Sequence, residues 1–121
     1  MRRLVVVIAI AALGGGRARA ADPVTAQLHL ESARAVVAVT IAAGWHVNAH
    51  DPTDRFLVPT TLDVTPPAGL RAGVALYPDA VEKVLAFSEG KRLRLYEGQV
   101  RIEVPLEGTP SGADPLRARL R

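Results

Sequence analysis

The residues best suited to chemistry are His46, Asn48 and His50, which alternate along one short stretch, with Asp51 and Asp54 just beyond. In an extended chain, alternate side chains lie on one face. Imidazole and carboxylate groups together can hold zinc or copper. Because the spacing is loose and no sulfur ligand is present, His46 and His50 are weak candidates for a metal site. A half-exposed turn is the simpler interpretation.

Other catalytic chemistry has little support in the sequence. The chain has no cysteine, and Met1 is its single methionine, so thiol chemistry has no atom to use. None of the serines lies in a Gly-x-Ser-x-Gly motif, and no pair of acids has the pattern of a glycosidase. We therefore assign no catalytic residue and no cofactor-binding residue.

The N-terminus has the pattern of an export signal. Arg2 and Arg3 precede an apolar run over 4–13, and Ala18-Arg19-Ala20 has the small residues that a signal peptidase recognises. Ten apolar residues are too few for a membrane-spanning helix, which needs about 20. We predict a signal peptide over 1–20, cleaved after Ala20, and a periplasmic protein that is not inserted in the membrane. An uncleaved anchor is the alternative.

The charge of the chain changes when this segment is removed. Four of its 15 Lys and Arg residues lie within 1–20, which leaves 11 basic residues against 12 acidic residues in 21–121. A basic nucleic-acid-binding surface is therefore not expected. Lys91, Arg92, Arg94 and Arg101 alternate with acids, which favours a solvated face of mixed charge.

The remaining 101 residues have the length of one domain, and their apolar residues recur with period two. Turn residues separate the segments. The pattern predicts an all-β, antiparallel sandwich, whose expected strands are 24–30, 37–41, 45–48, 57–65, 70–77, 81–87, 100–106 and 116–121. One helical turn within 79–87 is left open as an alternative.

Three details refine this prediction. Trp45 is expected in the core, since the chain has only five aromatic residues. Pro59 lacks a backbone N–H, so the segment 57–65 is expected to be bulged or at a sheet edge. No turn residue ends the segment 116–121, and we interpret domain 21–121 as incomplete there. An open edge recruits other strands, so we predict some self-association.

Several short motifs resemble, in order and spacing, the N-terminal periplasmic domain of the thiol:disulfide interchange protein DsbD. They are Gly44-Trp45-His46-Val47-Asn48, Pro52, Pro59-Thr60, Tyr77-Pro78 and Tyr96-Glu97-Gly98. The resemblance implies an immunoglobulin-like sandwich. It also implies thioredoxin-like or disulfide-isomerase partners, and a place in electron delivery to periplasmic disulfide proteins and cytochrome c maturation.

The family's redox chemistry depends on a cysteine pair that has no counterpart here. A module of this type that is not redox-active by itself is therefore the leading hypothesis. A cysteine-free immunoglobulin-like module that binds proteins is the alternative, and a weak metal-binding domain is the third. The two leading hypotheses share their fold and their location, and they differ in whether a cysteine pair follows Arg121.

Overall fold

The protein is nearly all strand. The computed structural model describes residues 6–10, 22–54, 56–111 and 115–121. These ranges contain no helix, and therefore no helix that could cross a membrane. The strands are β1 (Val6–Ile10), β2 (Val24–Glu31), β3 (Arg34–Ile41), β4 (Val47–Asn48), β5 (Leu62–Thr65), β6 (Leu70–Ala72), β7 (Val81–Val84), β8 (Arg92–Tyr96), β9 (Gln99–Gly108) and β10 (Leu116–Leu120).

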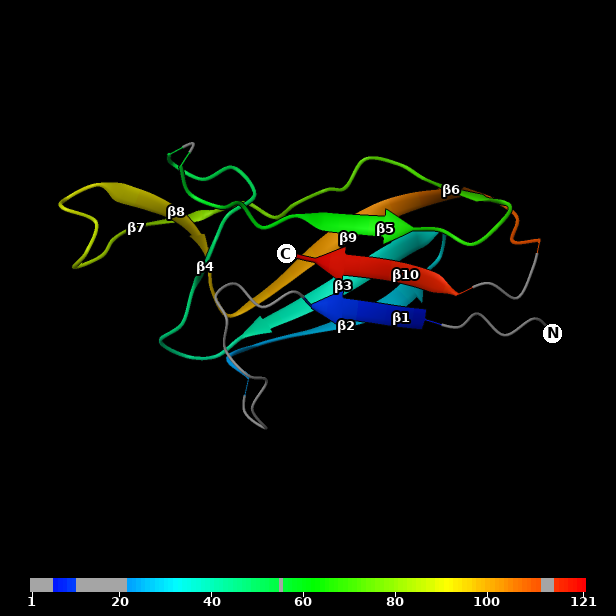
Figure 1. Cartoon of the computed structure of the whole chain (residues 1–121), viewed down its shortest axis with the longest axis horizontal. Coiled ribbons are helices and arrows are strands. Elements are labelled where there is room, and N and C mark those ends of the chain that lie inside the picture. Colours follow the sequence, from blue (N-terminus) through cyan, green and yellow to red (C-terminus); the bar gives the residue numbers. More distant parts are fainter. Residues whose placement is uncertain (1–5, 11–21, 55, 112–114) are drawn as a thin grey trace.

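The strands form three sheets with the orders β1-β10-β5, β2-β3-β9-β6 and β4-β8-β7. The first sheet lies across the second, and together they make the body of the molecule, while the third extends from one end (Figure 1). Among the described residues, β1 pairs with β10 in parallel and the other strand pairs are antiparallel. The predicted all-β, sandwich-like architecture is confirmed, with one parallel pair that the sequence did not indicate.

The hairpin of β2 and β3 shows how local sequence builds the body. Its two-residue turn is Ser32-Ala33, and Ser32 adopts a positive φ of 52°, as tight hairpin turns require. Val36, Val37 and Val39 follow in β3, where branching at Cβ suits a pleated strand. The predicted preference for strand over helix in this segment is confirmed.

The core lies between the two sheets of the body and is aliphatic. It is built from alternate residues of β3, β9, β5 and β10, because successive side chains of a strand point to opposite faces. Ile102 and Leu116 are fully buried. The core cluster comprises Ala35, Val37, Val39, Ile41, Ala49, Leu62, Tyr96, Ile102, Val104, Leu106, Leu116, Ala118 and Leu120.

Several expected strands are shorter in the structure, and one was missed. Pro59 lies outside β5, which begins at Leu62, consistent with a proline that cannot donate to a ladder. The segment 79–87 contains β7 followed by a turn, so its open alternative resolves to strand. Strand β8 was interpreted as a mixed-charge face, although Leu93 and Leu95 alternate with its arginines and are buried.

The expectation for Trp45 was wrong. Its side chain is 58% exposed, and the bulkiest fully buried side chain is Tyr96 instead. Trp45 lies in the connection between β3 and β4, outside any strand, so no pleat directs it inward. A single bulky aromatic residue in a small domain is therefore a poor guide to the core when its backbone is a loop.

Strand β1 falls within the predicted signal peptide. It pairs with β10 from Val6 opposite Leu116 to Ile10 opposite Leu120. The rest of 1–20, including the predicted cleavage site after Ala20, lies outside the described residues. The predicted signal peptide and its cleavage therefore stay predictions.

Candidate binding groove at one end of the sandwich

An open groove of about 470 Å³ lies at the end of the molecule formed by β4, β7, β8 and their loops. Its lining combines apolar, polar and charged side chains. We call it the tip groove. Its lining residues are His46, Asn48, Thr53, Asp54, Leu57, Phe87, Ser88, Glu89, Lys91 and Leu93.

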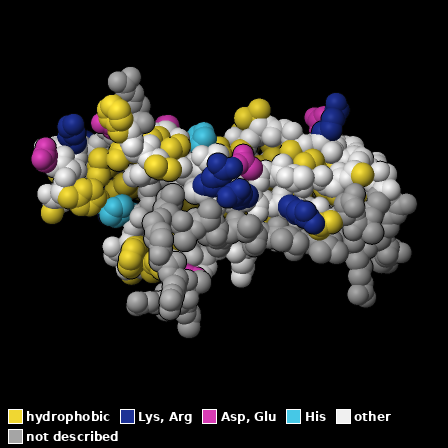
Figure 2. Space-filling model, viewed as in Figure 1, with side chains coloured by type: hydrophobic (Ala, Val, Ile, Leu, Met, Phe, Trp, Pro, Cys, Tyr) yellow, Lys and Arg dark blue, Asp and Glu magenta, His cyan; other side chains and the backbone are white. Residues whose placement is uncertain are grey.

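One exposed aromatic side chain lines this groove, and two more belong to residues that adjoin its lining residues in the chain. Phe87 is 70% exposed and lies in its wall, where its ring stacks on His46 with centroids 6.2 Å apart. Trp45 and Phe56 are also exposed, and each directly precedes a lining residue. Figure 2 shows apolar side chains on the surface of this end of the molecule. Three of the five aromatic residues in the chain are thus in contact with solvent at one end.

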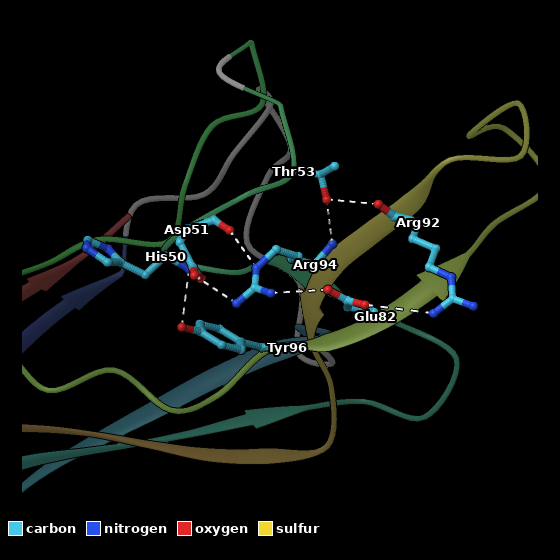
Figure 3. Close-up of polar contacts among 7 residues, drawn as sticks. All are labelled: His50, Asp51, Thr53, Glu82, Arg92, Arg94 and Tyr96. Carbon is cyan, nitrogen blue, oxygen red and sulfur yellow. Dashed lines mark hydrogen bonds and ion pairs between the residues drawn. The ribbon is translucent and has the colours of Figure 1, made fainter.

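One wall of the groove is fastened to β8 by Arg94 (Figure 3). Its guanidinium donates to Asp51 Oδ2 at 2.8 Å, to the Asp51 carbonyl at 3.0 Å and to Glu82 Oε1 at 3.2 Å. The hydrogen bond and charge of Asp51 raise the pKa of Arg94 above its ordinary value, with a smaller contribution from Glu82. Arg94 thereby ties the loop after β4 to both β7 and β8.

Thr53 completes this attachment. Its hydroxyl donates to the Arg92 carbonyl at 2.9 Å and accepts from the Arg94 N–H at 3.1 Å. The Ala49 N–H donates to the Arg94 carbonyl at 3.0 Å. The loop therefore follows β8 by hydrogen bonding although it is not itself a strand, and Thr53 is held at the groove.

Tyr96 links this end to the core. Its ring is 1% exposed, and its hydroxyl accepts the His50 N–H at 3.2 Å. Burial raises the pKa of Tyr96 because the phenolate would lose its water, while the hydrogen bond from His50 opposes this in part. Tyr77 plays a similar part beside it: its hydroxyl accepts the Leu62 N–H at 2.9 Å.

The opposite wall is held by Ser88. Its hydroxyl oxygen accepts the Leu85 N–H at 3.0 Å and lies 2.8 Å from the carbonyl oxygens of Leu85 and Lys91. A hydroxyl has one proton, so one of these carbonyls accepts it at a time. The turn that carries Phe87 is thus closed by a buried side chain, and the aromatic ring is presented from an ordered loop.

The two candidate metal ligands have different surroundings. His46 lines the tip groove against Phe87. His50 stacks on Tyr77 with centroids 3.6 Å apart, and its Nδ1 is 2.9 Å from the Thr60 carbonyl, so Nδ1 carries a proton. Asn48 does line the groove with His46, and its amide donates to the Val58 carbonyl.

Within the part of the chain that the structure describes, no group of three or more His, Cys, Asp or Glu residues could hold a metal ion. Asp51, expected near the histidines, is engaged by Arg94. Asp54 lines the groove and caps the next turn through the Phe56 N–H. The described residues therefore do not bring His46, His50 and the two acids together as one ligand set.

Sequence reasoning missed Phe87, which lines the groove, and Arg94, which holds the loop beside it. The mixed-charge expectation for Arg94 is consistent with its ion pairs but did not identify its structural role. The available signal for Phe87 was its place in Ala86-Phe87-Ser88-Glu89-Gly90, a turn that exposes whatever apolar residue it carries. Long-range partners such as Asp51, 43 positions away from Arg94, have no local signature.

No protein-family model matches the chain, and searches of curated proteins and of solved structures also give no match.

Proposed function

We propose that this chain is a periplasmic, immunoglobulin-like module of the DsbD N-terminal type that binds a protein partner and performs no thiol chemistry itself. The partner class that the motif resemblance supplies is a thioredoxin-like protein or a disulfide isomerase. The chain has no cysteine, so its contribution is docking. The N-terminal export pattern supports the periplasmic location.

The observation that carries this proposal is the exposure of Phe87 in the tip groove, together with the exposure of Trp45 and Phe56 next to lining residues in the chain. Aromatic side chains dominate binding energy at protein interfaces, and folded proteins rarely leave several of them exposed together. Phe87 and Trp45 are 70% and 58% exposed, while the core is built almost entirely from aliphatic residues. The chain therefore leaves its largest apolar surfaces where a partner can cover them.

The surrounding hydrogen bonds indicate a preformed docking site and not a flexible loop. Ser88 closes one wall, and Arg94 with Thr53 fastens the other. A preformed site loses little conformational entropy when it binds, which improves affinity without additional contacts. The groove is open and flanked by charged residues such as Glu89 and Lys91, which resembles the polar rim of a protein interface more than an enclosed small-molecule cavity.

The test is isothermal titration calorimetry of the full chain against purified periplasmic thioredoxin-like proteins and disulfide isomerases. We expect saturable binding to at least one of them. Trp45→Ala with Phe87→Ala should weaken that binding at least tenfold, because buried aromatic anchors each contribute about 2 kcal/mol or more.

The matched control is Val74→Ala. Val74 is 82% exposed but lies beside β9, in the body. We expect its affinity to equal that of the wild type. Equal losses in the control and the aromatic variant, or no binding to any member of the panel, would contradict the proposal.

A further inference from the structure

Strand β10 lies between two neighbours of different kinds. It is antiparallel to β5 on one side and parallel to β1 on the other. The β5 side belongs to the body, because Leu62 of β5 and Leu116, Ala118 and Leu120 of β10 all lie in the core cluster. The β1 side is filled by the segment that the sequence predicts to be a removable signal.

The hydrogen-bonding groups of β10 divide cleanly between these sides. Thr61 and Arg121 exchange both N–H···O=C bonds, at 3.1 and 2.9 Å, across the β5 side. Because such pairs alternate along an antiparallel ladder, Arg117 and Arg119 also bond toward β5. The backbone N–H and C=O groups of Leu116, Ala118 and Leu120 therefore face β1. A strand on this side can pair with all of them.

The outward face of β10 is strongly basic. Arg117, Arg119 and Arg121 are exposed and alternate with the buried core residues. The neighbouring β5 contributes one carboxylate, Asp63, which is 3.6 Å from Arg121. Strand β1 contains only apolar residues, so it adds none. Figure 2 shows this gathering of Lys and Arg side chains over β10 in the centre of the face.

This charge pattern determines which strands can pair with β10 on the side that β1 occupies. An antiparallel pairing of β10 with its copy would place Arg119 opposite or near Arg119, and like charges opposite each other destabilise a sheet. A strand with a carboxylate at every second position would instead place its acids beside the arginines, and its other residues over the apolar core. The self-association predicted for an open edge is therefore disfavoured at β10.

We propose that the β1 side of β10 is a strand-binding site for an extended segment of a partner protein that carries Asp or Glu at every second position. Residues 6–10 occupy this site as an internal competitor, and it is vacated when they leave. The site lies in the body, apart from the tip groove, and it does not depend on the function proposed above.

The test measures fluorescence anisotropy of the labelled peptide Val-Glu-Val-Glu-Val-Glu-Val and of a matched peptide with Lys in place of Glu. The proteins are the full wild-type chain and the full-length variant Ile8→Pro with Ala9→Pro. Adjacent prolines remove a donor from each side of β1. We expect the proline variant to bind the Glu peptide about tenfold more tightly than the Lys peptide, and more tightly than the wild type does.

A charge reversal on β10 tests the same site independently. Arg117→Glu in the proline background should weaken the preference for the Glu peptide, because it replaces one of the three arginines on the outward face with a carboxylate. Arg117 lies opposite the neutral Thr65, so the change places no like charge opposite Asp63. Arg71→Glu is the matched control, because Arg71 is exposed on β6 in the other sheet of the body. It should leave the preference unchanged.

Equal binding of the two peptides, or equal affinity with and without the prolines, would overturn the proposal. Dimerisation of the proline variant in sedimentation, with no peptide bound, would overturn it in favour of a second copy of the chain. If the two prolines unfold the chain, amide NMR of the milder full-length variant Ala9→Pro decides the matter: the Glu peptide should shift Leu116, Ala118 and Leu120, and a lack of shifts would contradict the site.

Discussion

The body and the tip of this molecule are stabilised in different ways. In the body, β3, β9, β5 and β10 bury aliphatic side chains between two sheets, and Ile102 is fully enclosed. At the tip, the strands are short, and loops are held by Arg94, Thr53 and Ser88 while Phe87 lies in solvent. One region keeps apolar surface from water, and the other displays it.

This difference separates the residues that stabilise the fold from the residues that are available for contact. A domain whose only purpose was stability would bury its aromatic rings, since each removes a large apolar area from water. Here the hydrogen bonds of Ser88 instead close the turn that carries the exposed ring of Phe87. The tip is therefore the region in which substitutions should change binding without changing the fold.

The largest expected effect is in the body. Ile102→Ala removes a fully buried side chain from the centre of β9 and should lower the free energy of unfolding by about 3–4 kcal/mol, because it leaves a cavity. Urea denaturation followed by circular dichroism measures this. A loss below about 1 kcal/mol would show that the body is not tightly packed and would break the comparison.

A smaller effect is expected where the body meets the tip. Tyr96→Phe removes the acceptor of the His50 N–H and should lower the free energy of unfolding by about 1 kcal/mol at neutral pH. Because burial raises the pKa of Tyr96, the folded state keeps the phenol proton more tightly than the unfolded chain does.

That linkage gives the substitution a pH signature. The stabilisation is complete below the ordinary tyrosine pKa of 10.0 and is lost as pH rises through the folded value. The wild type should therefore lose stability in alkali, and the difference between wild type and Tyr96→Phe should narrow there. Urea denaturation at neutral and alkaline pH checks this; a constant difference would argue against the linkage.

A local effect is expected within the tip. Arg94→Lys keeps the charge but cannot reproduce contacts to both Asp51 oxygens and Glu82, since a lysine lacks the planar fork. We expect faster hydrogen exchange at the amides of residues 49 and 94, whose N–H groups bond across this attachment, with little change in the body. Uniformly faster exchange across β3 and β9 would mean that tip and body unfold together.

The smallest effect on stability is expected at the groove wall. Phe87→Ala should change the free energy of unfolding by less than about 0.5 kcal/mol, because its ring is 70% exposed. Thermal unfolding measures this directly. A loss of the size expected for Ile102→Ala would show that Phe87 is a structural residue and would weaken its assignment to binding.

The body could be predicted from sequence because its signal is local. Alternation in 24–31, 99–108 and 116–120 follows from the two-residue period of a strand. The β-branched run in β3 then favoured a strand over a helix. What the pattern could not supply was the parallel pairing of β1 with β10, since that contact joins segments far apart in the chain and has no local code.

The tip could be predicted only in part. His46, Asn48 and His50 were expected to share one face. His46 and Asn48 both line the groove, whereas His50 stacks on Tyr77. Trp45 was misplaced because composition says how many aromatic residues exist, whereas loop geometry decides where they point. Arg94 was interpreted as surface charge, because its partners come from loops whose path is set by tertiary packing.

The exposure of Trp45 has a practical consequence, because it is the one tryptophan in the chain. Its indole is exposed to water in the native state. Its fluorescence emission should therefore be red-shifted before any denaturant is added, and it should change little when the chain unfolds. A ligand seated over it should shift that emission to the blue. The fluorescence of Trp45 therefore tests whether a partner covers the connection between β3 and β4.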